Sequence, residues 1–108
     1  MYKFGTIVLI EYPFTDLRGI KQRPAVVLKD TNDSDLVLAR ITGQTRDSDF
    51  DIQIEDWRSA GLLKPSIIRI HKLATLETKL VKRNLGQLSP SDLDKLSDRL
   101  RKFFSDNE

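Results

Sequence analysis

The hydrophobic period of the chain changes once, near the C-terminus, and this change limits the folds that the chain can adopt. After Ser89 the apolar residues recur at the spacing of one helical face; they are Leu93, Leu96, Leu100, Phe103 and Phe104. Ser89 is a natural N-cap, Pro90 suits the first helical position, and Asp92 can complete a capping box. The sequence therefore predicts one C-terminal helix, whose apolar face must pack on another layer of structure.

The residues before this helix predict that the other layer is a sheet. Short β-branched and apolar runs alternate there with clusters of turn-forming residues. The predicted strands are Phe4 to Tyr12, Pro24 to Leu28, Leu36 to Thr42, Phe50 to Glu55 and Ser66 to Leu73, with residues 76–80 extending or following the last one. We expect a single mainly-β domain over residues 1–108, in which a small curved or barrel-like antiparallel sheet carries the helix.

The composition excludes several classes of protein. The 108 residues include no cysteine, which rules out a disulfide framework and a thiolate zinc site and fits a reducing cytoplasm. No signal peptide is recognisable, and no apolar run approaches the roughly 20 residues of a membrane span. We therefore expect a cytoplasmic protein. The net charge of +2 permits an anionic partner without requiring one.

Several catalytic motifs are absent from the sequence. His71 is the single histidine, so two histidines cannot act as acid and base within one chain. Strand alternation places Ile68 and Ile70 on one face and His71 on the other, and we expect His71 to face solvent. The sequence also has no P-loop, no dinucleotide-binding glycine motif, no HExxH motif and no serine nucleophile elbow. We therefore predict no metal site and no cofactor.

A set of groups suited to binding phosphate remains: Lys21, Arg23, Arg40, Thr42, Gln44, Ser66 and Arg69. Arginine presents a planar fork of donors that matches phosphate oxygens, and hydroxyl groups donate to the same oxygens. Taken alone, Arg23 can be either a solvated charge at a strand end or a phosphate ligand held on rigid backbone. Strand propensity is enough to explain Thr42, and Arg40 and Arg69 are expected to be surface residues.

The order of four segments resembles the MazF/PemK family of toxins from bacterial toxin–antitoxin pairs. GTIVLIEYPFTDLRGIKQRPAVVLK is similar to the opening of that family, with a strand, a PFTD-like loop and an Arg-Pro pair before the second strand. LVLARITGQ resembles its third strand, which ends in a threonine, and the later segments GLLKPSIIRIHKL and LVKRNLGQLSPSDLDKLSDRLRKFF resemble its second half. Thr6 departs from the family, where an acidic residue is frequent, and we expect this to alter only a surface contact.

This resemblance implies a fold, an activity and a catalytic pair. The fold would be an SH3-like, MazF-CcdB-like β-barrel that forms a homodimer. The activity would be metal-independent, sequence-selective cleavage of single-stranded RNA, including mRNA, which inhibits growth. By position, the catalytic residues would be Arg23, from the Arg-Pro pair, and Thr42, at the end of the third strand. The loop from Pro13 to Gln22 matches a loop that borders the active site.

Further expectations concern the substrate and a partner. We expect the RNA to be contacted by Phe14, Lys21, Gln44 and Ser66. RNA carries its own nucleophile, the 2′-hydroxyl, so an enzyme can cleave it by aligning that oxygen and stabilising charge on the phosphorus. The acceptor of the 2′-hydroxyl proton stays open, since the pKa of arginine lies above about 12. The resemblance also implies an antitoxin whose acidic, disordered tail folds onto the toxin.

Two other classes of function remain open at this point. The first is a non-enzymatic toxin of the same general fold that inhibits DNA gyrase, although binding alone would not require the pair of Arg23 and Thr42. The second is an inactive nucleic-acid-binding barrel. In such a binder Arg23 would be an ordinary phosphate contact, whose loss lowers the affinity and its salt dependence.

Overall fold

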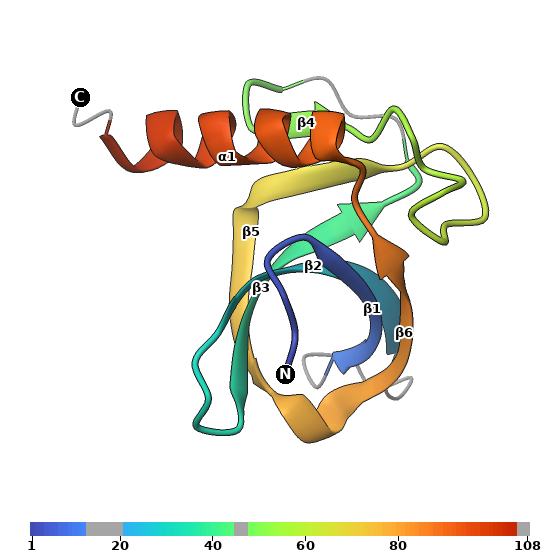
Figure 1. The fold of residues 1–108 in the computed structure, drawn as a ribbon, viewed down its shortest axis with the longest axis vertical. Coiled ribbons are helices and arrows are strands. Elements are labelled where there is room, and N and C mark those ends of the chain that lie inside the picture. The colour runs from blue at the N-terminus through green and yellow to red at the C-terminus, as the bar shows by residue number, and fades with distance from the viewer. Residues whose placement is uncertain (13–20, 45–47, 106–108) are drawn as a thin grey trace.

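The computed structural model describes residues 1–12, 21–44 and 48–105, which form one sheet and one long helix (Figure 1). The strands are β1 (Thr6–Tyr12), β2 (Lys21–Asp30), β3 (Asp35–Thr42), β4 (Asp51–Gln53), β5 (Ile67–Glu77) and β6 (Val81–Gln87). A short 3-10 helix, η1 (Thr78–Leu80), joins β5 to β6, and the helix α1 (Pro90–Ser105) follows β6. Within the described ranges, no helix is both long enough and apolar enough to span a membrane.

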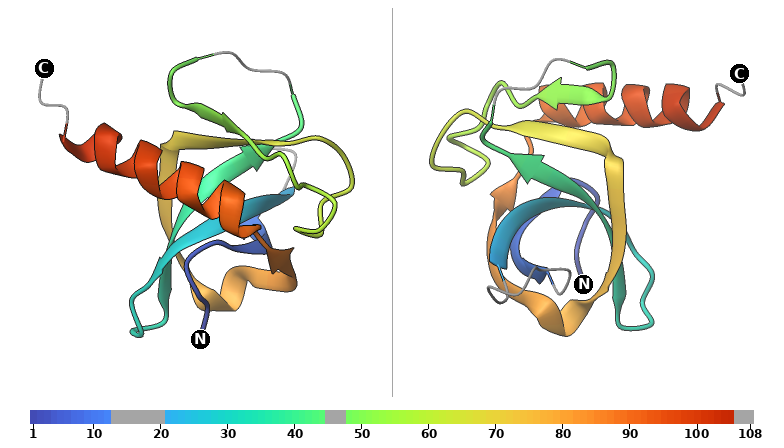
Figure 2. Two further views of the ribbon diagram at one scale, coloured as in Figure 1. Left: turned by 45° about the horizontal axis from the view of Figure 1, so that its top comes forward. Right: turned by 180° about the vertical axis from the view of Figure 1, so that it is seen from behind.

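The six strands form one antiparallel sheet in the order β4-β5-β3-β2-β1-β6. The sheet curls strongly, and α1 lies across one side of the curl, beside β4 and the first part of β5 (Figures 1 and 2). The mainly-β fold with a packed C-terminal helix is confirmed. The expected barrel is not closed, because no pairing joins the edge strands β4 and β6 in the described part of the chain. β4 has only three residues and pairs with the start of β5, away from β6.

Both faces of the central strands are buried, which explains their uninterrupted apolar runs. One cluster of buried residues, including Val8, Ile10 and Leu38, fills the curl of the sheet. A second cluster contains Val26 and Leu96 of α1, so it lies between the sheet and the helix. Since side chains alternate along a strand, neighbouring residues of β1, β2 and β3 enter different clusters.

The region after residue 66 differs from the sequence-based prediction. β5 continues to Glu77 as one strand, residues 78–80 form η1, and β6 follows as a strand that was not predicted. The side chains of β6 are exposed or half-buried throughout, so VKRNLGQ has no apolar alternation. β6 is an edge strand that pairs with β1 alone among the described strands, and this long-range pairing defines it.

Thr6 is not the surface position that we expected. Its side chain is buried, and its hydroxyl donates to Oε1 of Gln87 at 3.1 Å. Gln87 in turn donates from Nε2 to the carbonyl of Phe4 at 3.1 Å. These two hydrogen bonds tie the beginning of β1 to the end of β6, just before α1 begins.

The start of α1 follows the prediction for Ser89 but not for Asp92. Ser89 Oγ accepts a hydrogen bond from the N–H of Asp92 at 3.2 Å, as an N-cap should. The Asp92 carboxylate does not complete a capping box. It is 1% exposed and accepts the backbone N–H groups of Glu55 and Asp56 at 3.1 and 2.9 Å. The helix therefore supplies acceptors for the segment that follows β4.

We expect Asp92→Ala to lower the free energy of unfolding by about 1–3 kcal/mol, because two backbone donors lose their acceptor in a buried site. Asp94→Ala is the matched control, since Asp94 is exposed on the same helix. Urea denaturation followed by circular dichroism compares the two variants with the wild type. Equal losses in both variants would show that the contacts of Asp92 do not stabilise the fold.

Candidate functional site

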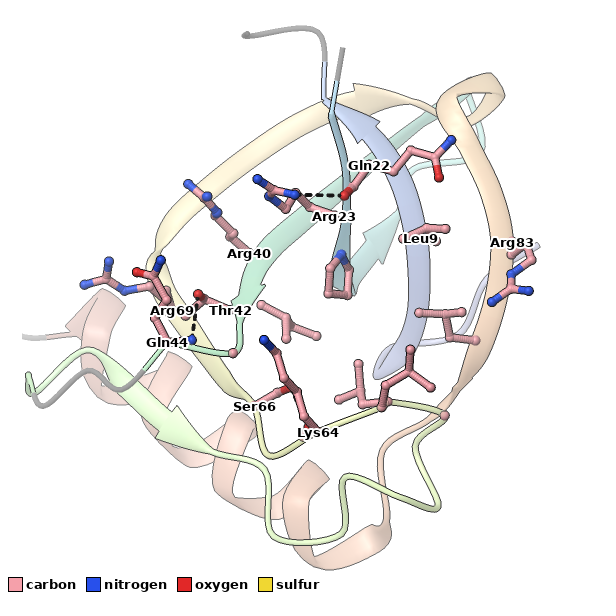
Figure 3. A pocket seen from close by; sticks show the side chains of 17 residues that line it. Leu9, Gln22, Arg23, Arg40, Thr42, Gln44, Lys64, Ser66, Arg69 and Arg83 are labelled. Carbon is pink, nitrogen blue, oxygen red and sulfur yellow. Dashed lines mark hydrogen bonds between the residues drawn. The ribbon is translucent and has the colours of Figure 1, made fainter. Parts of the chain in front are cut away.

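A cavity of about 490 Å³ lies beside the end of β3 (Figure 3). Its walls come from β1, β2, β3, β5, β6 and the turn at residues 61–64. Five cationic side chains line it, from Arg23, Arg40, Lys64, Arg69 and Arg83. None of the described residues that line the cavity is acidic. The cavity is therefore suited to an anionic ligand.

β2 and β3 bring Arg23 and Thr42 to this cavity. The last paired residues of β2 and β3 at this end are Ala25 and Arg40. Arg23 and Thr42 each lie two residues beyond this pair, and both line the cavity. Arg23 is half-buried, and its Nη1 donates to a neighbouring backbone carbonyl at 3.3 Å. Thr42 Oγ1 accepts the N–H of Gln44 at 3.2 Å, which leaves its own hydroxyl proton available to a ligand. The pair thus combines a charged donor and a neutral donor on rigid strands.

The predicted substrate contacts are distributed unevenly around this pair. Gln44 and Ser66 line the cavity, and the Ser66 hydroxyl donates to the carbonyl of Lys64 at 2.9 Å. Lys21 is exposed at the start of β2 and does not line the cavity. Phe14 lies outside the described residues. The structure therefore brings Gln44 and Ser66 to the candidate site but does not bring Lys21.

Sequence reasoning did not assign the other cations to the site. Arg40 is exposed, as expected, but the surface that it faces is the cavity. Its spacing of two residues from Thr42 was an available signal, because residues i and i+2 share one face of a strand. Lys64 lies in a turn and Arg83 lies on the edge strand β6. No local pattern marks either residue, because tertiary contacts set their positions.

Two glycines let the turn at residues 61–64 lie directly against β6. Gly61 has a φ of 86°, and a Cβ there would lie under 3.0 Å from the carbonyl of Leu85. A Cβ on Gly86 would lie as close to the carbonyl that precedes Gly61. Both obstacles are backbone atoms, which cannot move aside as a flexible side chain can. This close approach fixes the cavity wall that carries Lys64.

Gly86→Ala should destabilise the protein by about 1–3 kcal/mol, because the new methyl group overpacks two backbone segments. Gly43→Ala is the control, since a Cβ on Gly43 would meet only the flexible end of the Lys64 side chain. Thermal unfolding of both variants checks this expectation. If Gly86→Ala and Gly43→Ala unfold at the same temperature, the cavity wall does not depend on the close approach.

Arg69 is held at the edge of the site by an ion pair. Its Nε lies 2.9 Å from Oδ1 of Asp51, and the two side chains are 18% and 4% exposed. Oδ2 of Asp51 accepts the N–H and the hydroxyl of Ser48 at 3.2 and 2.9 Å. Burial raises the pKa of Asp51, but the hydrogen bonds from Arg69 and Ser48 and the charge of Arg69 outweigh it and hold that pKa below its ordinary value.

The lowered pKa of Asp51 should make stability sensitive to acid. The contribution of the ion pair is complete above the ordinary aspartate pKa of about 3.9 and is lost as the pH falls through the lower pKa of the folded protein. Asp51→Asn should therefore be less stable than the wild type at neutral pH but lose less stability between about pH 5 and pH 2. Urea unfolding across this range measures the difference, and parallel pH profiles would contradict it.

His71 is half-buried, so the expectation that it faces solvent is wrong. Its ring packs against Phe50 with centroids 5.1 Å apart, and its Nδ1 is buried without a hydrogen-bond partner in the described part of the chain. Burial, and then the charges of Arg69 and Lys72, lower the pKa of His71. His71 does not line the cavity. It is therefore a packing residue beside β4 and not an acid or base of the site.

Comparisons with known proteins identify a family and a fold. The family model for the PemK-like, MazF-like toxin of type II toxin–antitoxin systems matches residues 3–104. A solved endoribonuclease from a Mycobacterial species, in complex with its cognate antitoxin, has a TM-score of 0.77 and 14% identity, covering 100% of this chain and 99% of that chain. The Mycobacterium tuberculosis toxin MazF-mt6 also has a TM-score of 0.77, with 19% identity, covering 95% of this chain and 99% of that chain. No curated protein matches the chain.

Proposed function

Because the chain belongs to the PemK-like, MazF-like toxins of type II toxin–antitoxin systems, we propose that it is a metal-independent, sequence-selective endoribonuclease that cleaves single-stranded RNA. The observation that carries this proposal is the meeting of Arg23 and Thr42 in a cavity lined by cations and by no described acidic residue. Two solved structures of similar fold are Mycobacterial endoribonucleases. A single-stranded substrate also suits the chemistry, since a flexible backbone can reach the in-line geometry.

In the proposed reaction the RNA supplies the nucleophile. The 2′-oxygen bonds to the adjacent phosphorus and loses its proton, while the bond from phosphorus to the 5′-oxygen breaks and that oxygen gains a proton. The products are a 2′,3′-cyclic phosphate and a 5′-hydroxyl. Arg23 and Thr42 donate to the non-bridging oxygens and stabilise the charge that develops on the five-coordinate phosphorus. Their strands hold both donors before the substrate arrives, which lowers the cost of alignment.

Charge stabilisation is the contribution that we assign to this pair. The guanidinium of Arg23 is a poor base, because the pKa of arginine lies above about 12. Tyr12, whose phenol interacts with the charge of Arg40, is not a base either. Burial raises the pKa of this phenol, opposed by the charge of Arg40, so the phenol stays protonated near neutrality. No described residue that lines the cavity is an aspartate, a glutamate or a histidine. A modest rate is consistent with a site that relies on electrostatics.

We also propose a cognate antitoxin as the partner of this chain. One solved structure of similar fold is in complex with its cognate antitoxin. An acidic segment that folds on binding would suit the same cationic cavity and would compete with RNA for it. We further propose that the chain forms a homodimer and that it acts in the cytoplasm.

The test is cleavage of a long single-stranded RNA in excess EDTA, with the fragment ends mapped. The wild type should cut at discrete positions and leave 5′-hydroxyl ends. Arg23→Ala and Thr42→Ala should each lower the rate by about 100-fold or more, the cost of removing one donor to a charged transition state. Arg101→Ala is the control, because Arg101 is exposed on α1 and does not line the cavity; it should cleave as the wild type does.

Three results would overturn the proposal. Cleavage that survives Arg23→Ala unchanged would place the active site elsewhere or reveal a contaminant. RNA binding without cleavage would identify a nucleic-acid-binding barrel. Failure to bind RNA at all would favour a toxin that acts on a protein such as gyrase.

A further inference from the structure

Three arginines lie on one face of three neighbouring strands. Arg40 of β3 is directly opposite Arg69 of β5. Arg23 of β2 is two residues from Ala25, the β2 partner of Arg40, so Arg23 and Arg40 are diagonal neighbours. Figure 3 shows these three side chains along one side of the cavity, with Arg83 on the opposite side. The row leads from the pair of Arg23 and Thr42 toward β5.

The last arginine of the row has a fixed orientation. Asp51 of β4 is directly opposite Arg69 and binds it through Nε. Ser48 occupies the other oxygen of Asp51 with two hydrogen bonds, so the carboxylate is itself held in place. The terminal Nη donors of Arg69 have no hydrogen bond to any described residue. Asp51 thus fixes the guanidinium of Arg69 through Nε, and the two Nη groups can donate to a ligand.

Arg40 lacks such an anchor. It is exposed, and no described acidic residue forms an ion pair with it. Like charges directly opposite each other on neighbouring strands destabilise a sheet. Asp51 compensates one of the two positive charges and leaves the other uncompensated. An anion that contacts both guanidinium groups would remove this repulsion, and phosphate oxygens match their forked donors.

We propose that Arg40 and Arg69 form a second phosphate subsite, which binds the RNA phosphate next to the scissile one. This inference rests on the proposed function, in which Arg23 and Thr42 hold the scissile phosphate. The RNA backbone then crosses the sheet from β2 toward β5. Arg40 and Arg69 contribute binding and alignment of the strand, and they do not contact the reacting atoms.

The experiment uses a short RNA that spans one mapped cut. In a set of such oligonucleotides, each non-scissile phosphate in turn is replaced by a neutral methylphosphonate. For the wild type, one replacement next to the cut should raise KM by about tenfold, the value of one charge-assisted hydrogen-bonded contact. Arg40→Gln should raise KM for the unmodified RNA by a similar factor, with kcat changed less than about twofold. The same methylphosphonate should have no further effect on this variant.

Two further variants sharpen the assignment. Arg101→Gln removes one charge outside the cavity and should keep the wild-type response to every methylphosphonate. Arg69→Gln is made together with Asp51→Asn, so that no buried carboxylate loses its cation, and should abolish the effect of the same phosphate. The slope of log affinity against log salt should fall by about 0.7 in Arg40→Gln, as for one phosphate contact to a single strand.

Separate outcomes distinguish this inference from the proposed function. If the wild type cleaves RNA but Arg40→Gln responds to every methylphosphonate as the wild type does, the subsite is wrong and the function stands. A fall in kcat with unchanged KM would instead place Arg40 in the chemistry. If no RNA is cleaved, fluorescence anisotropy with any single-stranded oligonucleotide that the wild type binds decides the subsite: one methylphosphonate replacement should weaken binding to the wild type but not to Arg40→Gln. If Arg40→Gln keeps the RNA affinity of the wild type but binds a glutamate-rich peptide more weakly, the two arginines bind a protein partner and the inference is overturned.

Discussion

The pairing register of β2 and β3 is the constraint on which both the core and the cavity depend. Val26 and Ala39 are direct partners in this register, and both are buried in the cluster beneath α1. Because side chains alternate, the same register turns Arg23 and Thr42 to the other face, at the cavity. A slip of one residue would move every side chain of the slipped strand to the other face, which would turn Arg23 or Thr42 away from the cavity. Hydrophobic burial therefore maintains the alignment of the candidate catalytic pair.

The parts of the fold that depend on local patterns could be predicted from the sequence. The helix from Pro90 to Ser105 is one, because its apolar spacing and its N-cap lie within the segment itself. β6 and the open edge of the sheet could not be predicted, since an exposed edge strand is defined by its partner and not by its own periodicity. The contacts of Asp92 were missed for a similar reason. Its partners are 36 and 37 residues away in the chain.

The candidate site shows the same division between local and long-range information. The positions of Arg23 and Thr42 could be located from the order of the motifs, and the structure brings these two residues to one cavity. Alternation also gives the face on which Arg40 lies, but it does not give what lies opposite. The neighbour is Arg69 because β3 pairs with β5, and the register of that pairing shifts between Ala39 and Arg40. Only the assembled sheet could reveal a row of cations in place of separate surface charges.

Because β6 and α1 follow β2 and β3 in the chain, they set the order in which the site can be assembled. Asp92 of α1 holds the backbone of Glu55 and Asp56, and β6 supports the turn at Gly61. A ribosome synthesises Arg23 and Thr42 long before it synthesises these supports. Until β6 and α1 have been synthesised, the wall of the cavity lacks both the carboxylate and the strand that hold it. The geometry of the site can therefore be completed only after α1 has been synthesised, although Arg23 and Thr42 precede α1 by many residues.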